Sequence, residues 1–392
     1  MKRGIWRLSL RRVRAQPLQT GILALCIAVS IFLPVETRLL VARYERELTA
    51  RARATPMLAG PAGNRFDLAL TSLYFRASTL ATYRMDAFEA LASTDLATVI
   101  PLRLGCAARG HALVGTDPEY YRFRGLVPRA GTLPLRPGDI VLGAAVADAL
   151  DLAPGDTVFS DQRELYDIAQ PPALKMRVTG VLARRGTPDD DAIFTDLMTT
   201  WIIDGLAHGH GDVTKSIDPA LVLARSDDRI AVSGAFIEYN EVTPDTLTSL
   251  HLHVDHADLP LSAAIVVPRD AKAGTMLKAR VNAQALEQMI VPTDVIADLL
   301  AYVFRVQAML DGLSAVLAAC TLLLTGLVML LSTRLRAREM QTLHRIGAGR
   351  FTVARLYATE LLIILVASLV LAGTGILVAQ TVLPNLVFML AE

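Results

Sequence analysis

The sequence predicts an α+β membrane protein that has three transmembrane helices and a large extracytoplasmic domain between the first and the second. Three observations lead to this fold class. The 392 residues are 53% hydrophobic and 20% charged, with a mean hydropathy of +0.41, which is more apolar than a typical soluble domain. Long uncharged segments occur at 15–35, 312–333 and 361–391. The region between the first two of them mixes short alternating runs with helical patterns.

The positions of the basic residues predict how the chain is oriented. Residues 1–16 contain six lysines and arginines, at a spacing that suits an amphipathic helix on the cytoplasmic membrane surface. Residues 334–359 contain six arginines and one glutamate. By the positive-inside rule both segments lie in the cytoplasm, so the large domain lies on the other side of the membrane. The net charge of +1 gives no indication of a nucleic-acid partner.

The first apolar segment has two interpretations. A basic start and an apolar core are typical of a cleavable signal peptide, but no small-x-small cleavage motif comes directly after Val35. We therefore expect an uncleaved transmembrane helix at 17–36, and either interpretation exports the region that comes after it. Residues 36–53 contain no Gly or Pro, so they are expected to continue this helix as a stalk, until the prolines and glycines of 56–64 end it.

The large domain, with helical stalks at both ends, is expected to occupy 37–305. Its sequence alternates strand and helix patterns, and its one cysteine, Cys106, excludes an internal disulfide. The expected elements are strand, helix, Pro-Gly turn and strand at 141–158, a half-buried strand at 174–183, a turn-rich loop and strand end at 184–194, strands at 220–225 and 263–268, and helices at 271–290 and 293–311.

Two further membrane helices are expected, one at 306–333 and one at 360–392 that includes a short tail. The uncharged run 361–391 would be about 46 Å long as a helix, which is too long for one perpendicular crossing and too short for two. We expect Pro384 and Asn385 to divide it. The prediction is therefore three crossings, with the amino end inside and the carboxyl end outside.

The sequence contains no recognisable catalytic motif. Asp189, Asp190 and Asp191 come after Thr-Pro and are expected to form a solvated turn rather than a metal or acid–base site. In GHGDVTKS, at 209–216, Thr214 stands where a phosphate-binding loop needs glycine. No nucleophile elbow or zinc-protease helix motif is found. We expect no enzyme activity in this chain and no cofactor of its own.

Two parts of the sequence resemble MacB/FtsX-type ABC transporter permeases. RAREMQTLHRIGAGRFTVARLYATE, at 336–360, is similar to the cytoplasmic segment between their second and third membrane helices, although Gln341 stands where glycine is usual. The segments 138–158 and 174–194 resemble the MacB-like periplasmic domain. The residues that carry the first resemblance are Arg338, Glu339, Leu343, Gly347, Ala348 and Glu360. The family normally has a fourth membrane helix, and no fourth apolar segment is present here.

The resemblance implies a multi-pass permease subunit in a bacterial inner membrane, with its large domain in the periplasm. ATP and Mg²⁺ would be bound by a separate cytosolic ATPase, and residues 334–359 would form the segment that couples to it. An ordinary positive-inside loop is the alternative for that segment. Further implied partners are a second permease chain, in a homodimer or heterodimer, membrane lipids, and a periplasmic adaptor or lipoprotein.

Five of the seven histidines lie in two clusters. In HLHVDH, His251 and His253 fall on one face of a predicted strand because side chains alternate along a strand. Two imidazoles at this spacing can share zinc or copper. The candidate ligands are His208, His210, His251, His253 and His256. Exposed histidines without a bound ion are the alternative. Two other functions thus stay open, periplasmic metal handling or sensing and a scaffold that activates an envelope hydrolase.

Overall fold

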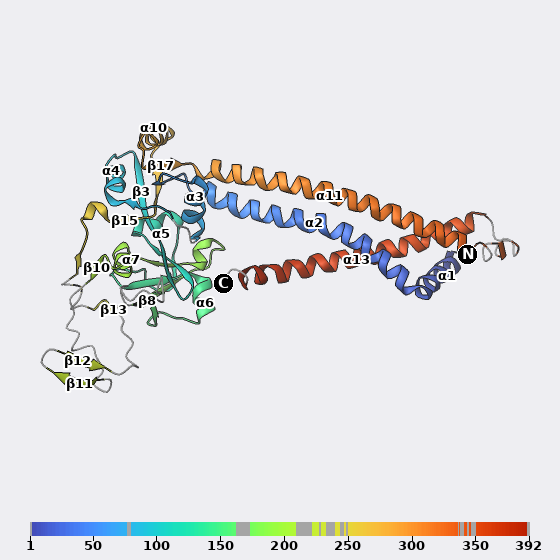
Figure 1. Cartoon of the computed structure of the whole chain (residues 1–392), viewed down its shortest axis with the longest axis horizontal. Helices are drawn as coiled ribbons and strands as arrows, with labels where there is room; N and C mark the ends of the chain where they lie inside the picture. Colours follow the sequence, from blue (N-terminus) through green and yellow to red (C-terminus); the bar gives the residue numbers. More distant parts are fainter. Residues whose placement is uncertain are drawn as a thin grey trace. The chain divides into compact units, whose positions relative to one another are not determined.

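The chain folds into two compact units, and each is described by itself. A computed structural model (Figure 1) describes residues 2–76, 80–161, 173–208, 222–226, 229–232, 240–243, 247, 250–335, 337, 341–342, 345 and 350–389. The helical unit comprises Met1–Glu47 and Leu300–Glu392, and the α+β domain comprises Leu48–Leu299. The division falls within two long helices, α2 (Pro17–Arg53) and α11 (Pro292–Leu335), so each of them contributes residues to both units.

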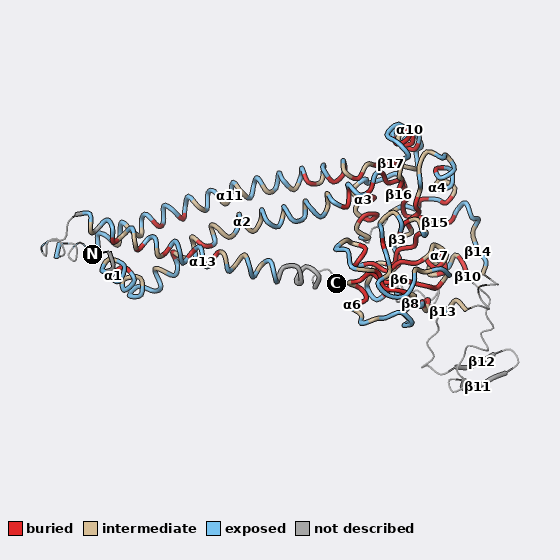
Figure 2. Tube along the Cα trace, turned by 180° about the vertical axis from the view of Figure 1, so that it is seen from behind, coloured by how far each residue is buried: buried red, intermediate tan, exposed pale blue. Residues whose placement is uncertain are grey.

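The helical unit contains the three helices that are long and apolar enough to cross a membrane. They are α2, α11 and the segment Ala354–Thr381 of α13 (Arg350–Met389). A shorter basic helix, α1 (Lys2–Ala15), precedes them. Most residues of the three long helices are exposed or intermediate, as Figure 2 shows, which suits contact with lipid. The predicted order is confirmed, with the α+β domain between the first and second membrane helices.

Small and hydroxyl-bearing residues join the helices of this unit. The hydroxyls of Ser30 on α2 and Thr321 on α11 are 3.0 Å apart. A Cβ at Gly375 of α13 would lie 3.3 Å from the ring of Phe32 on α2, so glycine allows these two helices to approach closely. Ser9 of α1 hydrogen-bonds to the hydroxyl of Thr359 on α13 at 2.6 Å.

Helix α13 differs from its prediction at its carboxyl end. It continues through Pro384 to Met389 over 40 residues, whereas a division at Pro384 and Asn385 was expected. Proline removes one hydrogen bond of the helix, but breaking the helix altogether would leave several backbone groups unpaired in an apolar surrounding.

The α+β domain is built on an eleven-stranded sheet. Its order is β13-β8-β6-β9-β4-β3-β16-β1-β17, and β5 and β7 also pair with β8. The strands are β1 (Met57–Pro61), β3 (Ala97–Ala108), β4 (His111–Gly115), β5 (Pro128–Gly131), β6 (Asp139–Leu142), β7 (Thr157–Phe159), β8 (Leu174–Leu182), β9 (Ile193–Thr195), β13 (Asn240–Glu241), β16 (Ala263–Pro268) and β17 (Glu287–Ile290). Three two-stranded pairs complete the described strands: β2 (Tyr83–Arg84) with β15 (Pro260–Leu261), β10 (Ala207–His208) with β14 (His251–Leu252), and β11 (Val222–Ser226) with β12 (Arg229–Val232).

Short helices pack beside these strands, and the domain has one principal core. Ile140, Val178 and Ile193 are almost fully buried in it. The predicted elements at 141–158, 174–183, 184–194 and 263–268 are confirmed. The helices are α3 (Arg65–Tyr74), α4 (Met85–Ala92), α5 (Pro118–Arg124), α6 (Ala144–Leu150), α7 (Leu197–Ile203) and α10 (Ala271–Asn282), with single turns η1 (Pro188–Asp191) and η3 (His256–Asp258).

Two further segments differ from their predictions, and both are strands that pair with each other. Residues 57–61 were expected in a loop but form β1, which is buried along its whole length between β16 and β17. Residues 287–290 were expected in a helix but form β17. A strand buried on both faces shows no alternation, and Glu, Gln and Met favour helix unless tertiary pairing overrides them. At Gly60 a Cβ would lie 2.6 Å from the end of the buried Leu68 side chain, so a larger residue there would require Leu68 to move.

Candidate functional site: the buried anchor of helix α2

Both long helices connect to the sheet through adjacent strands. Helix α2 ends at Arg53 and β1 begins at Met57, while β17 ends at Ile290 and α11 begins at Pro292. The two strands are antiparallel partners, with Leu58 opposite Ile290. The ends of the two helices are therefore joined to neighbouring strands of one hydrogen-bonded ladder.

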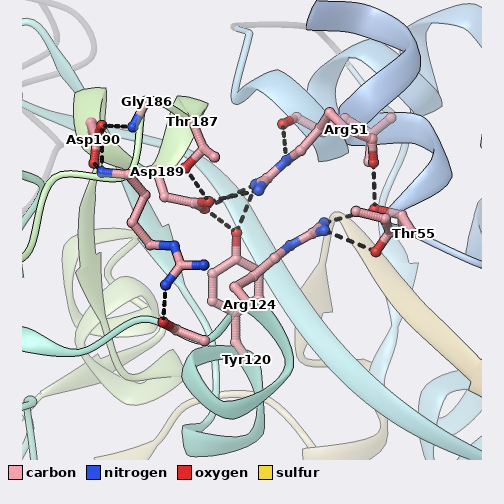
Figure 3. Close-up of polar contacts among 12 residues, drawn as sticks. Arg51, Thr55, Tyr120, Arg124, Gly186, Thr187, Asp189 and Asp190 are labelled. Atoms are coloured by element: carbon pink, nitrogen blue, oxygen red, sulfur yellow. Dashed lines mark hydrogen bonds and ion pairs between the residues drawn. The ribbon is translucent and has the colours of Figure 1, made fainter.

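The last turns of α2 are fixed to the α+β domain by Arg51. This side chain is only 6% exposed. Its Nη1 and Nη2 donate to the two carboxylate oxygens of Asp189 at 2.6 and 2.9 Å, which is the bidentate geometry that suits a guanidinium (Figure 3). Nη2 also donates to the Tyr120 hydroxyl at 3.1 Å, and Nε donates to the carbonyl of Leu73 at 3.1 Å. Arg51 thus joins α2 to α3, α5 and η1.

Asp189 uses its full capacity to accept hydrogen bonds. Besides the two bonds from Arg51, it accepts one from the Tyr120 hydroxyl at 2.6 Å and one from the Thr187 hydroxyl at 3.0 Å. An ionised carboxylate has about four acceptor positions. Since the side chain is 2% exposed, these partners replace the water that it loses. We call Arg51, Tyr120 and Asp189 the Arg51 cluster.

A second layer of contacts holds the residues around the Arg51 cluster. Thr55 donates to the carbonyl of Arg51 at 3.1 Å and accepts from Nη2 of Arg124 at 2.8 Å. The Tyr74 hydroxyl donates to the carbonyl of Leu48 at 2.9 Å. The end of α2 is therefore bound on several sides, by backbone and by side chains.

The turn η1 is held in place by its own hydrogen bonds and by a close approach to α6. Asp190, also buried, accepts from the backbone N–H groups of Arg185 and Gly186. A Cβ at Gly143, just before α6, would lie 2.3 Å from the carbonyl oxygen of Asp190 and 2.5 Å from that of Asp189. A side chain at position 143 would collide with these carbonyl oxygens, so the turn can hold Asp189 beside Arg51 only with glycine there.

The protonation of the cluster is determined by its surroundings. Burial by itself raises the pKa of Asp189, but the charge of Arg51 and the hydrogen bonds from Arg51 and Tyr120 outweigh it, so this pKa lies below its usual value. Burial, together with the charge of Asp189, raises the pKa of the Tyr120 hydroxyl. At neutral pH the cluster therefore holds an arginine cation, an aspartate anion and a neutral phenol.

The prediction of a solvated turn was wrong for two of the three aspartates, Asp189 and Asp190. Asp189 and Asp190 are 2% and 5% exposed, so they are not a solvated turn. Asp191 lies in the same turn and is exposed, and partial loss of water around it together with the charge of Asp190 raises its pKa. Sequence reasoning also missed Arg51, because it lies in a charged helix among other arginines and its partner is 138 residues away.

Most residues predicted to couple to an ATPase lie outside the described part of the chain. These are Arg338, Glu339, Leu343, Gly347 and Ala348. Glu360 is described and lies on α13, where it is 8% exposed. Its Oε2 is buried without a hydrogen-bond partner among the described residues.

The predicted histidine ligands are placed in part. His251 and His253 have their ring centroids 4.9 Å apart. His256 lies in η3, and its Nε2 is 2.9 Å from Oε1 of Glu89. His210 lies outside the described residues, and of His208 the backbone alone is described, in β10. Among the side chains that the structure describes, no group of three or more His, Cys, Asp or Glu could hold a metal ion.

The architecture defines a membrane protein that carries a large α+β domain between its first and second membrane helices. A family model described as the MacB-like periplasmic core domain matches residues 24–235, which is more than half of the chain. The chain belongs to this family, whose members are permeases of MacB/FtsX-type ABC transporters. The family implies an ABC ATPase as a partner. None of the curated proteins matches this chain.

The solved structures that are similar to parts of the chain include the following three. The periplasmic region of MacB from Actinobacillus actinomycetemcomitans is 12% identical, covers 63% of this chain and 94% of its own, and has a TM-score of 0.37. The extracellular domain of the noncanonic ABC-type transporter YknZ from Gram-positive bacteria is 11% identical, with coverages of 60% and 99% and a TM-score of 0.32. A domain of a putative permease from Porphyromonas gingivalis is 10% identical, with coverages of 60% and 86% and a TM-score of 0.25.

Proposed function

We propose that this chain transmits the ATP-driven motion of a separate ATPase to its α+β domain, which then exports or releases a substrate outside the inner membrane of a bacterium. The observation that carries the proposal is the buried Arg51 cluster, which fixes the end of a continuous membrane helix to the α+β domain. In this arrangement the amino end and residues 334–359 lie in the cytoplasm, and the α+β domain lies in the periplasm.

The length of the two helices supports a mechanical role. Helices α2 and α11 have 37 and 44 residues, whereas about 20 suffice to cross the hydrocarbon core. At about 1.5 Å per residue they are about 55 and 66 Å long. A continuous helix keeps its backbone hydrogen bonds when one end is displaced, so it carries the displacement to its other end.

The attachment of both helices to the sheet supports the same role. Helix α2 is anchored by Arg51, and α11 comes directly after β17, which pairs with β1. Binding of ATP by the partner would favour one of two arrangements of these helices, and the attached strands would move with them. The residues proposed to receive the motion are Arg338, Glu339, Leu343, Gly347, Ala348 and Glu360 in the coupling segment and at its border with α13.

Hydrogen exchange of the whole complex tests the proposal. The permease is reconstituted in nanodiscs with its ATPase, and amide exchange in β1, β17 and η1 is measured with and without ATP, in wild type and in a Leu39→Gly/Leu40→Gly variant. Both leucines are exposed on α2, so the change mainly weakens the helix, by about 1 kcal/mol per glycine.

The expected result is an ATP-dependent change of exchange in these three elements that is lost in the double-glycine variant, while the ATPase still co-purifies. Met276→Gly, at an exposed position of α10, is the matched control and is expected to keep the response. The proposal would be overturned if ATP caused no change of amide exchange in the α+β domain of wild type. It would also be overturned if the double-glycine variant kept the ATP-dependent change.

A further inference from the structure

A buried serine holds the short basic helix α1 against α13. The Ser9 side chain is fully buried, and its Oγ lies 2.6 Å from the hydroxyl of Thr359. It also donates to the carbonyl oxygen of Leu356 at 3.4 Å. A hydroxyl that bonds to a neighbouring helix fixes how its own helix is rotated about the axis. The contact therefore decides which side chains of α1 point outward.

Three arginines lie on the side of α1 that is turned away from this contact. Arg7 and Arg11 are each two residues from Ser9, which is about 200° around a helix, and Arg14 is on the same face as both. All three side chains are exposed, and none has an ion-pair partner among the residues that the structure describes. The first 35 residues contain no Asp or Glu. We call Arg7, Arg11 and Arg14 the outer arginines; their charge is not balanced within this part of the chain.

Apolar side chains border the outer arginines. Trp6 and Leu10, one helical turn apart, are 49% and 40% exposed, and Leu8 on the other flank is 42% exposed. A basic face beside Trp and Leu is typical of a helix that lies between the headgroups and the acyl chains of a membrane. An acidic protein surface would pair with the arginines but would not supply an apolar layer for Trp6 and Leu10. This arrangement therefore favours lipid as the occupant.

The attachments of α1 place it at the level of the headgroups. At its carboxyl end, Ala15 is followed after one residue by α2, whose uncharged run begins there. Along its length, Ser9 contacts Leu356 and Thr359, which lie in the first two turns of the candidate membrane segment Ala354–Thr381. Both attachments are thus at the ends of apolar segments, where the hydrocarbon core meets the headgroup layer.

We propose that the outer arginines bind the headgroups of anionic phospholipids. A guanidinium binds phosphate through two parallel hydrogen bonds, and the additional negative charge of an anionic headgroup favours it over a zwitterionic one. Trp6 and Leu10 insert beside the acyl chains, and the arginine stems extend from there to the phosphates. Bound in this way, α1 holds the beginnings of α2 and α13 at one membrane surface.

Quenching of Trp6 by brominated lipids tests the proposal. The full-length protein is placed in phosphatidylcholine nanodiscs that contain a small fraction of brominated phosphatidylglycerol, or the same fraction of brominated phosphatidylcholine. The only other tryptophan, Trp201, is buried in the core of the α+β domain, out of contact with acyl chains. The signal that disappears in Trp6→Phe belongs to Trp6. One basic side chain favours an anionic surface by about fivefold, so phosphatidylglycerol should bind at least about fivefold more tightly than phosphatidylcholine.

The variant Arg7→Gln/Arg11→Gln/Arg14→Gln should bring this preference close to one. Because the three positions are exposed, it is expected to keep the thermal stability of wild type.

A matched control removes the same charge from exposed positions of α2. It is Arg43→Gln/Arg46→Gln/Arg53→Gln, and it is expected to keep the preference for phosphatidylglycerol.

Three outcomes would overturn the proposal. Wild type could show no preference between the two lipids, or the outer-arginine variant could keep the preference of wild type. Equal losses in the outer-arginine variant and in the control would show that net charge, and not the face of α1, attracts the lipid. The measurement involves no ATPase, so its result is independent of the hydrogen-exchange experiment.

Discussion

Two arginine–aspartate pairs on the same helix show how the surroundings decide what an ion pair contributes. Arg38 of α2 pairs with Asp311 of α11 at 3.0 Å, and Arg51 pairs with Asp189 at 2.6 Å. The side chains of the first pair are 64% and 29% exposed, and those of the second are 6% and 2% exposed. Water competes for the first pair and screens it, whereas the second depends on its protein partners.

The buried pair specifies the geometry of the anchor. Removing one partner of a buried pair leaves the other as an uncompensated charge, which is far more costly than the pair itself is favourable. Arg51 and Asp189 therefore tolerate few alternative arrangements. Arg38 and Asp311 can separate and be hydrated at little cost, so this exposed pair allows the two long helices to move relative to each other.

The largest expected effect is that of Arg51→Ala. It leaves the Asp189 carboxylate buried without its cation, so the free energy of unfolding of the α+β domain should fall by about 3–5 kcal/mol. The measurement is denaturant unfolding of the full chain, monitored by the fluorescence of the buried Trp201 in a Trp6→Phe background. Arg53→Ala, at an exposed position two residues further on, is the control, with an expected change below about 0.5 kcal/mol. Similar losses of unfolding free energy in both variants would show that the buried pair contributes no more to stability than an exposed arginine does.

A smaller effect on the free energy of unfolding is expected when the pH is lowered. Because the folded-state pKa of Asp189 lies below the unfolded value of about 3.9, its contribution to stability is present above that value and is lost as the pH falls through the folded-state pKa. The variant Asp189→Asn has no titratable carboxyl group at position 189. The difference in unfolding free energy between wild type and Asp189→Asn should therefore shrink as the pH falls below about 4.

The same fluorescence measurement, repeated between pH 7 and pH 3, checks this expectation. Arg51, Tyr120 and Arg124 surround the carboxylate, and none of them is expected to lose or gain a proton in this range. A difference that stays constant, or that grows toward low pH, would contradict the lowered pKa of Asp189.

The smallest expected effect is that of Arg38→Ala. Exposed ion pairs contribute about 0–1 kcal/mol, so the thermal stability of the protein in nanodiscs should change little. The change should be smaller still at high salt, because salt screens the pair. Arg46→Ala is a suitable control, because the Arg46 side chain donates within its own helix, to the carbonyl of Ala42. A loss as large as that of Arg51→Ala would break the contrast between the two pairs.

The sequence alone determined the order of the membrane helices and the α+β domain, and much of the local structure. The uncharged segments predicted the three membrane helices, and the stalk character of 36–53 predicted that α2 continues to Arg53. The sequence pattern also predicted the strands and the helix that the structure has between residues 139 and 159. These features depend on residues that are near neighbours in the chain, because helical and strand periodicity is local. The same locality placed His251 and His253 on one face.

Only the tertiary structure decided the anchor of α2 and the strands beside it. Thr-Pro-Asp-Asp-Asp has the composition of an exposed turn, and nothing nearby indicates that Asp189 meets Arg51 from 138 residues away. The pairing of β1 with β17 and the position of His208 opposite His251 likewise join distant segments. Burial, and with it the strength of an ion pair, depends on what the rest of the chain brings to a site, and local sequence patterns do not contain that information.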